Sequence, residues 1–411
     1  MSLLVLKFGG TSVGDIERIK NAAAKVEAEV RKGHKVAVVV SAMAGVTDQL
    51  IGYCRSMSPH HDPREHDAVV STGENITAGL MAMALKQRGL NARSWQGWQV
   101  PLRTDSTHSK ARITDIKPDD LKKRILDGEV GVMAGFQGIT HDNSISTLGR
   151  GGSDTSAVAL AIALKAERCD IYTDVDGVYT TDPRIDSKAS RIPRISYEEM
   201  LEMASRGAKV LQTRSVEMAM RYRMPVQVLS TFANAVGSEL PGTLVTDGDD
   251  TMEENLVTGI AYTRDQAKVT LVKVSDQPGV AAAIFGPLAR AGVNVDMIVQ
   301  TASDNNQTTD ITFTISKNDM ERAKQVLEGE RGRIKFDHIT ASGGVVKISL
   351  IGGGMRSHAG VAATMFETLA EKKINIQAIE TSEIVLGVLI SEEYTELALR
   401  ALHTAYGLDA K

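Results

Sequence analysis

The chain has 411 residues, of which 42% are hydrophobic and 24% are charged, and its formal net charge at pH 7 is −4. This length predicts two or three domains, and this balance of apolar and charged residues is typical of a soluble globular protein. A nucleic-acid-binding protein usually carries an excess of basic residues, and this chain has none, so we expect no nucleic-acid partner.

The start of the chain and its cysteines point to the cytoplasm. The sequence MSLLVLKFGG lacks a basic leader, and its apolar run is too short for a signal peptide or a membrane span. The two cysteines, Cys54 and Cys169, cannot build a disulfide framework and fit a reducing compartment. We therefore expect a cytoplasmic protein with no membrane partner.

The first part of the chain, from residue 3 to about residue 232, alternates short β-branched runs with helical stretches. A helix is expected over residues 15–32, and the runs are LLVLKF, KVAVVVSA, GVMAGFQG, CDIYTDV and MPVQVLS. These runs are apolar on both faces, as strands of a parallel sheet must be when helices cover both sides. The pattern predicts an α/β sandwich.

The stretch LKFGGTSVGD joins the first expected strand to the first expected helix. Lys7 ends the strand, Gly9 and Gly10 form the turn, and the chain then enters the helix by way of Thr11 or Ser12. Backbone N–H groups at such a junction bind anions, and Lys7 adds a positive charge. The spacing of a Walker loop or of a dinucleotide fingerprint is absent. We interpret the stretch as a phosphate site, with a tight turn and a surface lysine as the alternative.

A second glycine-rich turn, LGRGGSDTS at residues 148–156, precedes the apolar helix SAVALAIALKA. Its glycines would let a phosphate approach the bare backbone N–H groups closely. Arg150 offers a bidentate pair for a substrate carboxylate. Asp154 could orient Lys7 or a metal ion, with a simple helix cap as its alternative role. Two helix N-termini are thus expected to face one cleft.

An aspartate-rich stretch, YTDVDGVYTTDPR at residues 172–184, follows another expected strand end. Ligands of open α/β sheets bind at such ends, so we interpret this stretch as a pocket for a nucleotide base and ribose. A calcium site is the alternative, but the EF-hand spacing with its final glutamate is absent.

The stretch SPHHDPREH contains three histidines, His60, His61 and His66, and could imitate a metal cluster. Its proline-flanked, polar surroundings indicate a solvated loop instead.

The chain repeats itself after an acidic, aperiodic stretch, TDGDDTMEEN at residues 246–255. GVAAAIFGPLARAGVNVDMI from Gly279 and GVAATMFETLAEKKINIQAI from Gly360 share their first four residues, and each places an asparagine, Asn294 or Asn375, before the next strand. Each copy follows an expected strand, so two βαββαβ units are predicted after a linker. The alternative is common helical patterning without repeated structure.

Together the motifs resemble one family. KFGGTSV, VVVSAMAGVTD, STGE, VPLRTD, GFQG, TLGRGGSDTSAVALA, YTDVDGVYTTDPR and EMASRGAKVLQTRSVEMA are similar to motifs of aspartate kinase, a member of the amino-acid kinase family that carries a tandem of ACT regulatory domains. The resemblance implies a three-layer αβα sandwich followed by two ferredoxin-like units. The implied boundaries are a catalytic domain over residues 1–245, a linker over 246–262, and ACT domains over 263–342 and 343–411.

Two stretches depart from the family pattern. Arg206 occupies a position that is usually hydrophobic in the family, and IVLGVLI, residues 384–390, lacks the basic residue that often follows TSEI. The first departure leaves open how side chains pack around Arg206. The second leaves open the details of the second regulatory repeat.

The resemblance implies that the protein transfers the γ-phosphoryl group of ATP to the β-carboxylate of L-aspartate, with Mg²⁺, as the first step toward lysine, threonine, methionine and diaminopimelate. The implied catalytic residues are Lys7, Asp154 and Arg150. The implied ATP-binding positions are Lys7, Phe8, Gly9, Gly10, Thr173, Asp174, Tyr179, Arg184, Lys209 and Val210. The implied aspartate-binding positions are Ser41, Thr47, Glu74, Arg150, Gly151, Gly152 and Ser153.

The resemblance also implies control by lysine and threonine, and association through the ACT domains as a homo-oligomer or with a shorter regulatory chain. Met252 lies in the linker, where such a chain could start. The implied effector positions are Asp276, Ala281, Gln300, Val361, Ala362, Asn375, Ile376, Thr381 and Ser382. The alternatives are another amino-acid kinase, acting on glutamate or uridylate, and an amino-acid sensor that has lost catalysis.

Overall fold

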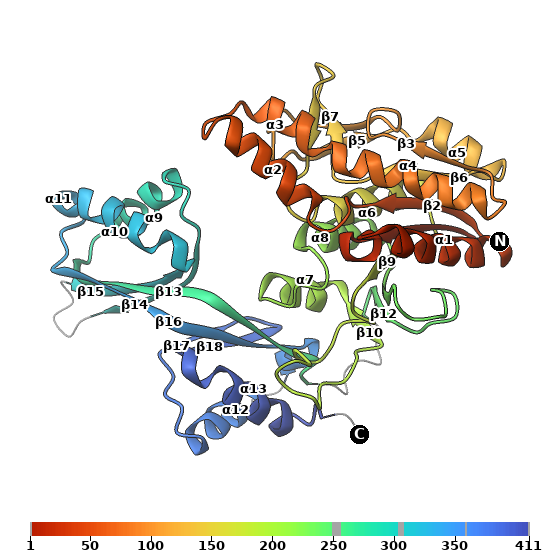
Figure 1. The fold of residues 1–411 in the computed structure, drawn as a ribbon. Helices are drawn as coiled ribbons and strands as arrows, with labels where there is room; N and C mark the ends of the chain where they lie inside the picture. Colours follow the sequence, from red (N-terminus) through yellow and green to blue (C-terminus); the bar gives the residue numbers. More distant parts are fainter. Residues whose placement is uncertain (1, 249–255, 303–307, 358–359, 410–411) are drawn as a thin grey trace. The chain divides into compact units, whose positions relative to one another are not determined.

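The computed structural model describes residues 2–248, 256–302, 308–357 and 360–409. The chain divides into two compact units (Figure 1). The N-terminal unit comprises Met1–Val178, Arg191–Ser205 and Lys209–Asp250, and the C-terminal unit comprises Tyr179–Ser190, Arg206–Ala208 and Thr251–Lys411. Residues 249–255 of the expected linker, Met252 among them, lie outside the described residues. Two short segments from the first part of the chain thus belong to the C-terminal unit.

The N-terminal unit is built on an eight-stranded sheet in the order β10-β12-β11-β9-β1-β2-β6-β3. Its strand β1 (Leu3–Phe8) pairs in parallel with β2 (Lys35–Val40) and with β9 (Arg168–Thr173). The remaining pairs are also parallel, except that β11 and β12 run antiparallel. The remaining strands are β3 (Ala92–Trp95), β6 (Val130–Ala134), β10 (Arg194–Ser196), β11 (Val226–Ser230) and β12 (Thr243–Thr246). The largely parallel sheet predicted from the apolar runs is confirmed.

Helices cover both faces of this sheet (Figure 1). The helices α1 (Ile16–Arg31) and α4 (Thr72–Gln87) pack on the face where Leu6 and Phe8 belong to the buried core. On the opposite face, α6 (Gly152–Leu164) packs against β1 and beside α8 (Thr213–Tyr222). The other helices of this unit are α2 (Val46–Met57), α3 (Pro63–Val70), α5 (Asp119–Leu126) and α7 (Tyr197–Ser205). These layers form the predicted sandwich.

A small second sheet in the N-terminal unit does not follow from the sequence pattern. Its order is β5-β4-β7-β8, and its strands are β4 (Leu102–Thr104), β5 (Ile113–Ile116), β7 (Gln137–Ile139) and β8 (Ile145–Thr147). Strands of three or four residues are too short to show a period of two. The sheet matters for the site because β8 leads directly into the glycine turn before α6.

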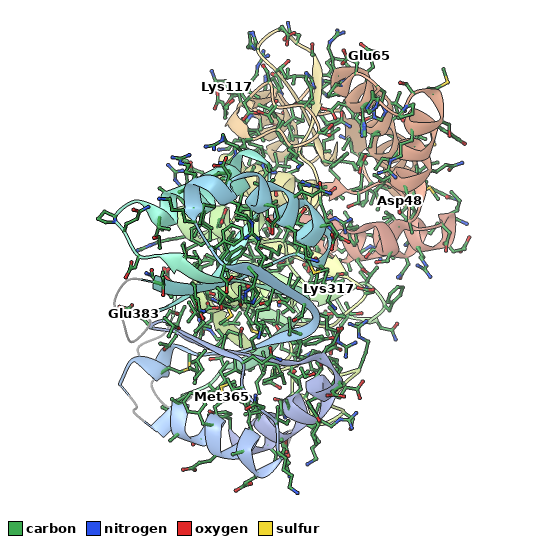
Figure 2. The ribbon with its side chains drawn as sticks, turned by 90° about the vertical axis from the view of Figure 1, so that its left-hand side faces the viewer. Asp48, Glu65, Lys117, Lys317, Met365 and Glu383 are labelled. Carbon is green, nitrogen blue, oxygen red and sulfur yellow. The ribbon has the colours of Figure 1, made fainter. Side chains whose placement is uncertain are left out.

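The C-terminal unit contains one six-stranded antiparallel sheet in the order β14-β15-β13-β16-β18-β17. Its strands are β13 (Gly259–Ser275), β14 (Val295–Ala302), β15 (Thr308–Ile315), β16 (His338–Ile351), β17 (Ala378–Thr381) and β18 (Val385–Ser391). Its helices are α9 (Val280–Arg290), α10 (Met320–Gly329), α11 (Arg331–Ile334), α12 (Gly360–Glu371) and α13 (Thr395–Ala405). The first three pack in one core, and α12 and α13 pack in a second core, which contains the fully buried Met365. Figure 2 labels Met365 on α12.

The two longest strands, β13 and β16, run through both cores. The start of β13, residues 259–263, pairs with residues 347–351 of β16, and Ile260 belongs to the core of α12 and α13. Farther along β13 the strand also pairs with β15, and Val269 belongs to the core of α9 and α10. The first βαββαβ unit is therefore continuous in sequence, whereas the second takes one strand from residues that precede the first. Both predicted ferredoxin-like units are confirmed, and the domain boundaries stay a prediction.

The internal repeat appears in the structure as two equivalent helices. Gly279 caps α9 with a φ of 92°, a left-handed conformation that suits glycine, and Gly360 is the first residue of α12. Asn294 immediately precedes β14, and Asn375 lies shortly before β17. Common helical patterning alone does not produce this correspondence.

Arg206, which departs from the family pattern, forms an ion pair inside the C-terminal unit. Its Nη2 atom lies 2.7 Å from Glu380 Oε1, and Glu380 Oε2 lies 3.7 Å from Nζ of Lys347, a residue that is 3% exposed. A hydrophobic residue at position 206 would remove one of the two cations beside Glu380. The second departure falls on β18, whose residues 385–390 are all buried, so a basic side chain there would need a buried partner.

The histidine-rich stretch is not a loop throughout. The helix α3 begins at Pro63, because proline suits the first helical position and the Asp62 carboxylate accepts a hydrogen bond from the backbone N–H of Arg64. His66 lies on α3, and its ring stacks on that of His61 with centroids 5.1 Å apart. The prediction of a solvated loop is therefore wrong for residues 63–66.

Within the described ranges, no helix combines the length and the apolar character needed to cross a membrane. Cys54 and Cys169 are both free and buried.

Candidate active site

Lys7 and Asp154 form a buried ion pair between the end of β1 and the first turn of α6. Lys7 Nζ lies 2.5 Å from Asp154 Oδ1, and each side chain is 10% exposed. Side chains alternate along a strand, so Lys7 points toward α6 while its neighbours Leu6 and Phe8 pack in the core on the opposite face. The pair holds an ammonium group at the carboxyl end of a central strand, where open α/β sheets bind ligands.

The glycines after β1 let the chain pass close to neighbouring atoms, and Gly10 lies next to the segment that follows β2. A Cβ atom on Gly10 would lie 3.1 Å from the carbonyl oxygen of Ala42, and one on Gly9 would lie 3.3 Å from Lys7 Nζ. A Cβ atom 3.1 Å from a backbone oxygen is closer than most Cβ contacts in proteins. A larger residue at position 10 would therefore require the backbone at Ala42 to shift. The predicted ATP positions at the end of β1 thus lie next to the predicted aspartate position Ser41.

The chain after these glycines does not enter α1 directly. It makes a 3-10 turn, η1 (Gly10–Val13), and α1 begins at Ile16, where the Asp15 carboxylate caps it. The Ser12 hydroxyl is fully buried and donates a hydrogen bond of 3.2 Å to the carbonyl oxygen of Tyr172 on β9. The helix predicted over residues 15–32 is confirmed, and Thr11 and Ser12 lie in the 3-10 turn that precedes it, where Ser12 is bonded to β9.

Neighbouring protein atoms explain the glycines of the turn before α6. Gly149 and Gly151 have φ angles of 76° and 73°, a left-handed conformation that glycine adopts without strain. A Cβ atom on Gly151 would lie 2.0 Å from Gln212 Cγ, and one on Gly152 would lie 2.8 Å from Phe136 Cδ2. These contacts show why the positions require glycine, whereas the predicted approach of a phosphate to their backbone N–H groups stays a prediction. Their contact with substrate stays a prediction.

Glu74 is a buried carboxylate beside the end of β2. It lies in the first turn of α4, is 3% exposed, and accepts a hydrogen bond of 3.0 Å at Oε1 from the backbone N–H of Ala42. Its Oε2 atom is buried without a hydrogen-bond partner. Burial raises the pKa of Glu74 to about 7, since desolvation disfavours the charged form more than the bond from Ala42 favours it. A substrate ammonium at Oε2 would satisfy this atom.

A pocket of about 300 Å³ lies beside the glycine turn, and four of its six lining residues are cationic. The lining consists of Lys110, Arg112, Leu148, Gly149, Arg150 and Arg214. Arg214 is held by hydrogen bonds of 2.6 Å to the carbonyl oxygen of Leu148 and 3.0 Å to that of Ala111. Burial and the neighbouring Arg112 lower the pKa of Arg214. Because like charges repel, this pocket suits a carboxylate or phosphate group.

Asp67 supports this region in a way that sequence reasoning missed. Its carboxylate is fully buried and accepts hydrogen bonds from the backbone N–H and hydroxyl groups of both Ser109 and Thr147. His108 Nδ1 lies 3.0 Å from the same carboxylate. Asp67 thus joins α3, the loop before β5, and β8, which leads into the glycine turn. An aspartate within a polar helix gives no sequence signal for such a role.

Many of the predicted site residues lie at neighbouring strand ends and helix starts of the N-terminal unit. The ends of β1, β2 and β9 are adjacent in the sheet, and close contacts join the start of α4 to Ala42 and the start of α6 to Gly135 after β6. These strand ends and the starts of α2, α4 and α6 carry Lys7, Phe8, Gly9, Gly10, Ser41, Thr47, Glu74, Ser153, Asp154, Thr173 and Asp174.

The other predicted nucleotide residues are divided between the units. Lys209 and Val210 precede α8 in the N-terminal unit. Tyr179 and Arg184 belong to the C-terminal unit, and Arg184 Nη2 lies 2.8 Å from Asp182 Oδ2. The nucleotide contacts of these four residues stay a prediction.

Two of the predicted effector positions lie on the edge strands of the six-stranded sheet. Gln300 is on edge strand β14 and Thr381 is on edge strand β17, and both are exposed. Ile298 and Ile379, on the same two strands, are 54% and 48% exposed. An edge strand with exposed apolar side chains is suited to pairing with another chain. The remaining positions around α9, α12 and β17 are Asp276, Ala281, Val361, Ala362, Asn375, Ile376 and Ser382.

The fold and the site define a class of protein, an amino acid kinase with ACT domains. The model of the amino acid kinase family matches residues 2–230, and the model of the ACT domain matches residues 269–330 and 348–406. The chain is 53% identical to an aspartate kinase of Stutzerimonas stutzeri, over 100% of this chain and 98% of that protein. It belongs to the aspartate kinases of the amino acid kinase family.

Solved structures agree with this assignment. The chain is similar to E. coli aspartokinase III in complex with aspartate and ADP, described as the R-state, with a TM-score of 0.81 and 27% identity over 98% of this chain and 99% of that one. It is also similar to the same enzyme in complex with lysine and aspartate, described as the T-state, with a TM-score of 0.74 and 28% identity over 98% and 99% of the two chains.

Proposed function

We propose that this protein transfers the γ-phosphoryl group of ATP to the β-carboxylate of L-aspartate, giving 4-phospho-L-aspartate in the cytoplasm as the first step toward lysine, threonine, methionine and diaminopimelate. The observation that carries the proposal is the ion pair between Lys7 and Asp154 at the end of β1, with the Glu74 carboxylate at the end of the adjacent strand. The family assignment and the relative that binds aspartate and ADP support the choice of substrates.

The chemistry requires charge neutralisation and alignment rather than a general base. The β-carboxylate of aspartate is ionised at neutral pH, so no side chain has to deprotonate it. In this mechanism the Lys7 ammonium stabilises the negative charge on the transferring phosphoryl group. Arg150 holds the α-carboxylate of aspartate through two hydrogen bonds, and Glu74 holds its ammonium.

The residues at this site fit ATP bound with Mg²⁺. The Asp154 carboxylate lies in the first turn of α6 with its Oδ1 atom paired to Lys7, and because a carboxylate has two acceptor oxygens, it can hold a cation in addition to Lys7. Mg²⁺ is usually held by one or two carboxylates together with substrate phosphates, and when bound it neutralises phosphate charge. Asp154 would be its ligand from the protein. Thr173, Asp174, Lys209 and Val210 would align the nucleotide, together with Tyr179 and Arg184.

Aspartate-dependent release of ADP tests the proposed function. The purified protein should release ADP from MgATP when aspartate is present, and hydroxylamine should trap the acyl phosphate product as a hydroxamate. Glutamate and UMP serve as controls, because related kinases phosphorylate them. A rate that does not depend on aspartate, or a faster rate with glutamate or UMP, would overturn the proposal.

Glu74 should make aspartate binding depend on pH. Its pKa is about 7, and the protonated form cannot pair with an ammonium group. The KM for aspartate should therefore fall by about tenfold between about pH 6 and pH 8, in inverse proportion to the ionised fraction of Glu74. The variant Glu74→Gln should have a high KM for aspartate that does not change over this range, whereas its KM for ATP should stay close to that of the wild type. Steady-state kinetics at several pH values measure both constants.

Unfolding of the ligand-free protein provides an independent control for this prediction. The pKa of Glu74 in the folded state lies above its ordinary value of 4.5, so folding favours the protonated form. This stabilising contribution is complete below about pH 4.5 and is lost as the pH rises through about 7, which lowers the free energy of unfolding by about 3 kcal/mol. The neutral variant Glu74→Gln should lack this decrease. A decrease of equal size in both proteins would contradict the assignment to Glu74.

We also propose feedback inhibition by lysine together with threonine at the edges of the C-terminal sheet. The relative that binds lysine supports lysine as an effector. An effector inhibits only if it binds the inactive arrangement more tightly than the active one, and linkage then requires substrates to oppose it. The exposed edge strands support assembly with a second copy or with a shorter regulatory chain.

Replacing Gln300 by alanine should relieve this inhibition. Loss of one effector hydrogen bond should raise the concentration of lysine plus threonine needed for half inhibition by about tenfold, while the uninhibited kcat stays within about twofold of the wild type. Thr381→Ile should act in the same direction. Gln325→Ala, which changes an exposed glutamine on α10, is the matched control and should leave inhibition unchanged. A wild-type rate that saturating lysine plus threonine does not lower would remove the regulatory assignment.

A further inference from the structure

A segment of the predicted nucleotide site is built into the second core of the C-terminal unit. The chain passes into this unit at Tyr179 and leaves it after Ser190. Ile185 of this segment belongs to the core of α12 and α13, and the carbonyl oxygen of Ile185 accepts a hydrogen bond of 2.8 Å from Arg400 Nε on α13. The position of Tyr179 and Arg184 therefore depends on what holds this segment to α13.

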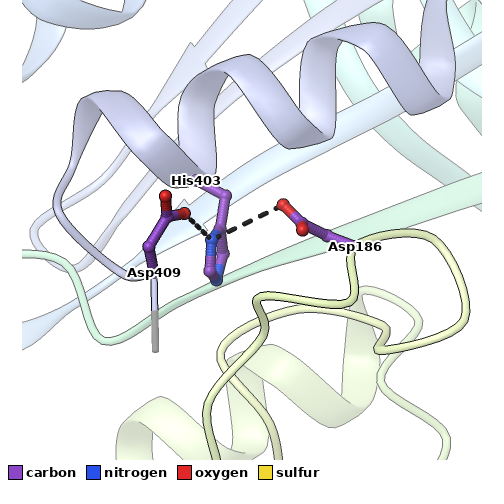
Figure 3. Close-up of side chains that lie close together, drawn as sticks. All are labelled: Asp186, His403 and Asp409. Atoms are coloured by element: carbon purple, nitrogen blue, oxygen red, sulfur yellow. Dashed lines mark hydrogen bonds and ion pairs between the residues drawn. The ribbon is translucent and has the colours of Figure 1, made fainter. Parts of the chain in front are cut away.

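His403 on α13 makes the most deeply buried polar contact with this segment. Its side chain has no exposed surface, and its Nε2 atom lies 2.8 Å from the hydroxyl oxygen of Thr180. On its other side, Nδ1 lies 2.9 Å from Asp409 Oδ1 and 3.6 Å from Asp186 Oδ2 (Figure 3). The Thr180 hydroxyl oxygen also accepts a hydrogen bond of 3.0 Å from the backbone N–H of Ser190. The two ends of the segment are thus joined to each other and to His403.

Hydrogen bonding, rather than a metal ion, accounts for this cluster. Asp186, His403 and Asp409 are the three side chains in the described part of the chain whose ligand atoms converge within 4.8 Å. A carboxylate can only accept, so Nδ1 of His403 donates to Asp409, and Nε2 shares a hydrogen bond with the Thr180 hydroxyl. The ammonium of Lys188 lies 2.8 Å from Asp409 Oδ2 and already supplies a cation there. Both ring nitrogens therefore have partners within the protein.

Other contacts also hold the segment, among them a hydrogen bond of 3.1 Å from the Tyr262 hydroxyl to Asp182 Oδ2. The ion pair of Lys188 with Asp409 is formed by a lysine side chain that is 60% exposed, and exposed pairs contribute little to stability. The carbonyl oxygen of Thr180 accepts a hydrogen bond of 2.6 Å from Ile260 on β13, which fixes the backbone at one point. Among the described residues, the His403 ring bonds the Thr180 hydroxyl, which also accepts a hydrogen bond from the backbone N–H of Ser190 at the far end of the segment.

We propose that His403 is a positioning residue for the nucleotide: through the Thr180 hydroxyl it holds Tyr179–Ser190 in the conformation that binds ATP, so the last helix of the regulatory sheet contributes to ATP affinity. The proposal rests on the proposed function, because Tyr179 and Arg184 are nucleotide-binding in that mechanism. His403 touches no substrate, and its effect passes through the segment alone.

Two substitutions at His403 separate its two contacts. The amide of glutamine extends about as far as Nε2 and can keep the bond to Thr180, whereas the shorter asparagine reaches only toward Asp409. In the full-length protein, His403→Asn should raise the KM for ATP about fivefold, with kcat and the KM for aspartate within about twofold of the wild type. His403→Gln should restore most of the ATP affinity. Thr180→Val should repeat the effect of His403→Asn, and Thr180→Ser should not.

Hydrogen exchange measures how firmly His403 holds the segment 179–190, which we call the anchor, without relying on catalysis. The backbone amides of residues 179–190 should exchange at least about fivefold faster in His403→Asn than in His403→Gln, since a weaker anchor lets the segment open more often. His338→Asn, which removes an exposed histidine on β16, is the matched control and should change neither exchange nor the KM for ATP. If His403→Asn does not fold, the comparison of Thr180→Val with Thr180→Ser carries the same test.

The outcomes distinguish this proposal from the proposed function. Equal exchange in the asparagine and glutamine variants would overturn the anchor. Faster exchange with an unchanged KM for ATP would show an anchored segment that does not position the nucleotide, and would overturn the proposal as well. A wild-type protein without aspartate-dependent ADP release but with saturable ATP binding would refute the proposed function alone, and the dissociation constant for ATP would then replace KM in the comparison.

Discussion

Replacing Lys7 by alanine should lower kcat by about 10²- to 10³-fold and raise the KM for ATP by much less, because a preorganised cation acts mainly on charge that develops in the transition state. The ion pair with Asp154 places the ammonium group at the carboxyl end of β1, within a site that is largely shielded from water. Steady-state kinetics with saturating aspartate separate the two constants. An unchanged kcat would remove Lys7 from the chemistry.

A second buried lysine provides the control for this result. Lys25 is 3% exposed, but it donates to the carbonyl oxygens of Ala233 and Ala235 and has no part in the proposed mechanism. Lys25→Ala should lower the melting temperature and leave kcat at a permissive temperature close to that of the wild type. Lys7→Ala also leaves Asp154 without its partner, so the double variant Lys7→Ala/Asp154→Asn shows whether a loss of activity follows from lost stability.

Replacing Arg150 by lysine should raise the KM for aspartate by about 10- to 100-fold while the KM for ATP stays within about threefold. Lysine keeps the positive charge but cannot form the two parallel hydrogen bonds that a guanidinium makes with a carboxylate. Arg150 lines the cationic pocket beside the glycine turn, where Lys110, Arg112 and Arg214 also supply positive charge. Charge alone is therefore abundant there, and geometry should decide the difference.

The same kinetic experiment can contradict this assignment. A rise in the KM for ATP equal to that for aspartate would move Arg150 to the nucleotide side of the site. Arg55→Lys, a change to an exposed arginine on α2, is the matched control and should alter neither constant.

The sequence predicts the parts of this fold that are long and regular. The runs at β1, β2 and β9 are apolar on both faces and were sufficient to predict a parallel sheet with a site at its carboxyl end. The repeated glycine and asparagine likewise predict the two ferredoxin-like units. These features depend on local patterning, which a single chain displays directly.

Other features depend on contacts that are distant in sequence. The glycines near residue 151 indicate a special backbone, but the reason for Gly151 is the side chain of Gln212, sixty-one positions later. Ser12 looks like a helix cap in sequence and instead bonds Tyr172 on another strand. The buried roles of Asp67 and His403 have the same origin, because a polar residue shows its partner only after the chain has folded.

The length of β13 limits where a separate regulatory chain can begin. A fragment cut at residue 263, the expected start of the first ACT domain, would lose most of residues 259–263 and expose the edge of β16 in the second core. A fragment that begins at Met252 would retain all of β13 and could complete the six-stranded sheet. It would still lack Thr180 and Arg206, the partners of His403 and Glu380. A chain that starts at Met252 would therefore contain the complete sheet. The contacts of His403 with Thr180 and of Glu380 with Arg206 would form only within the full-length chain.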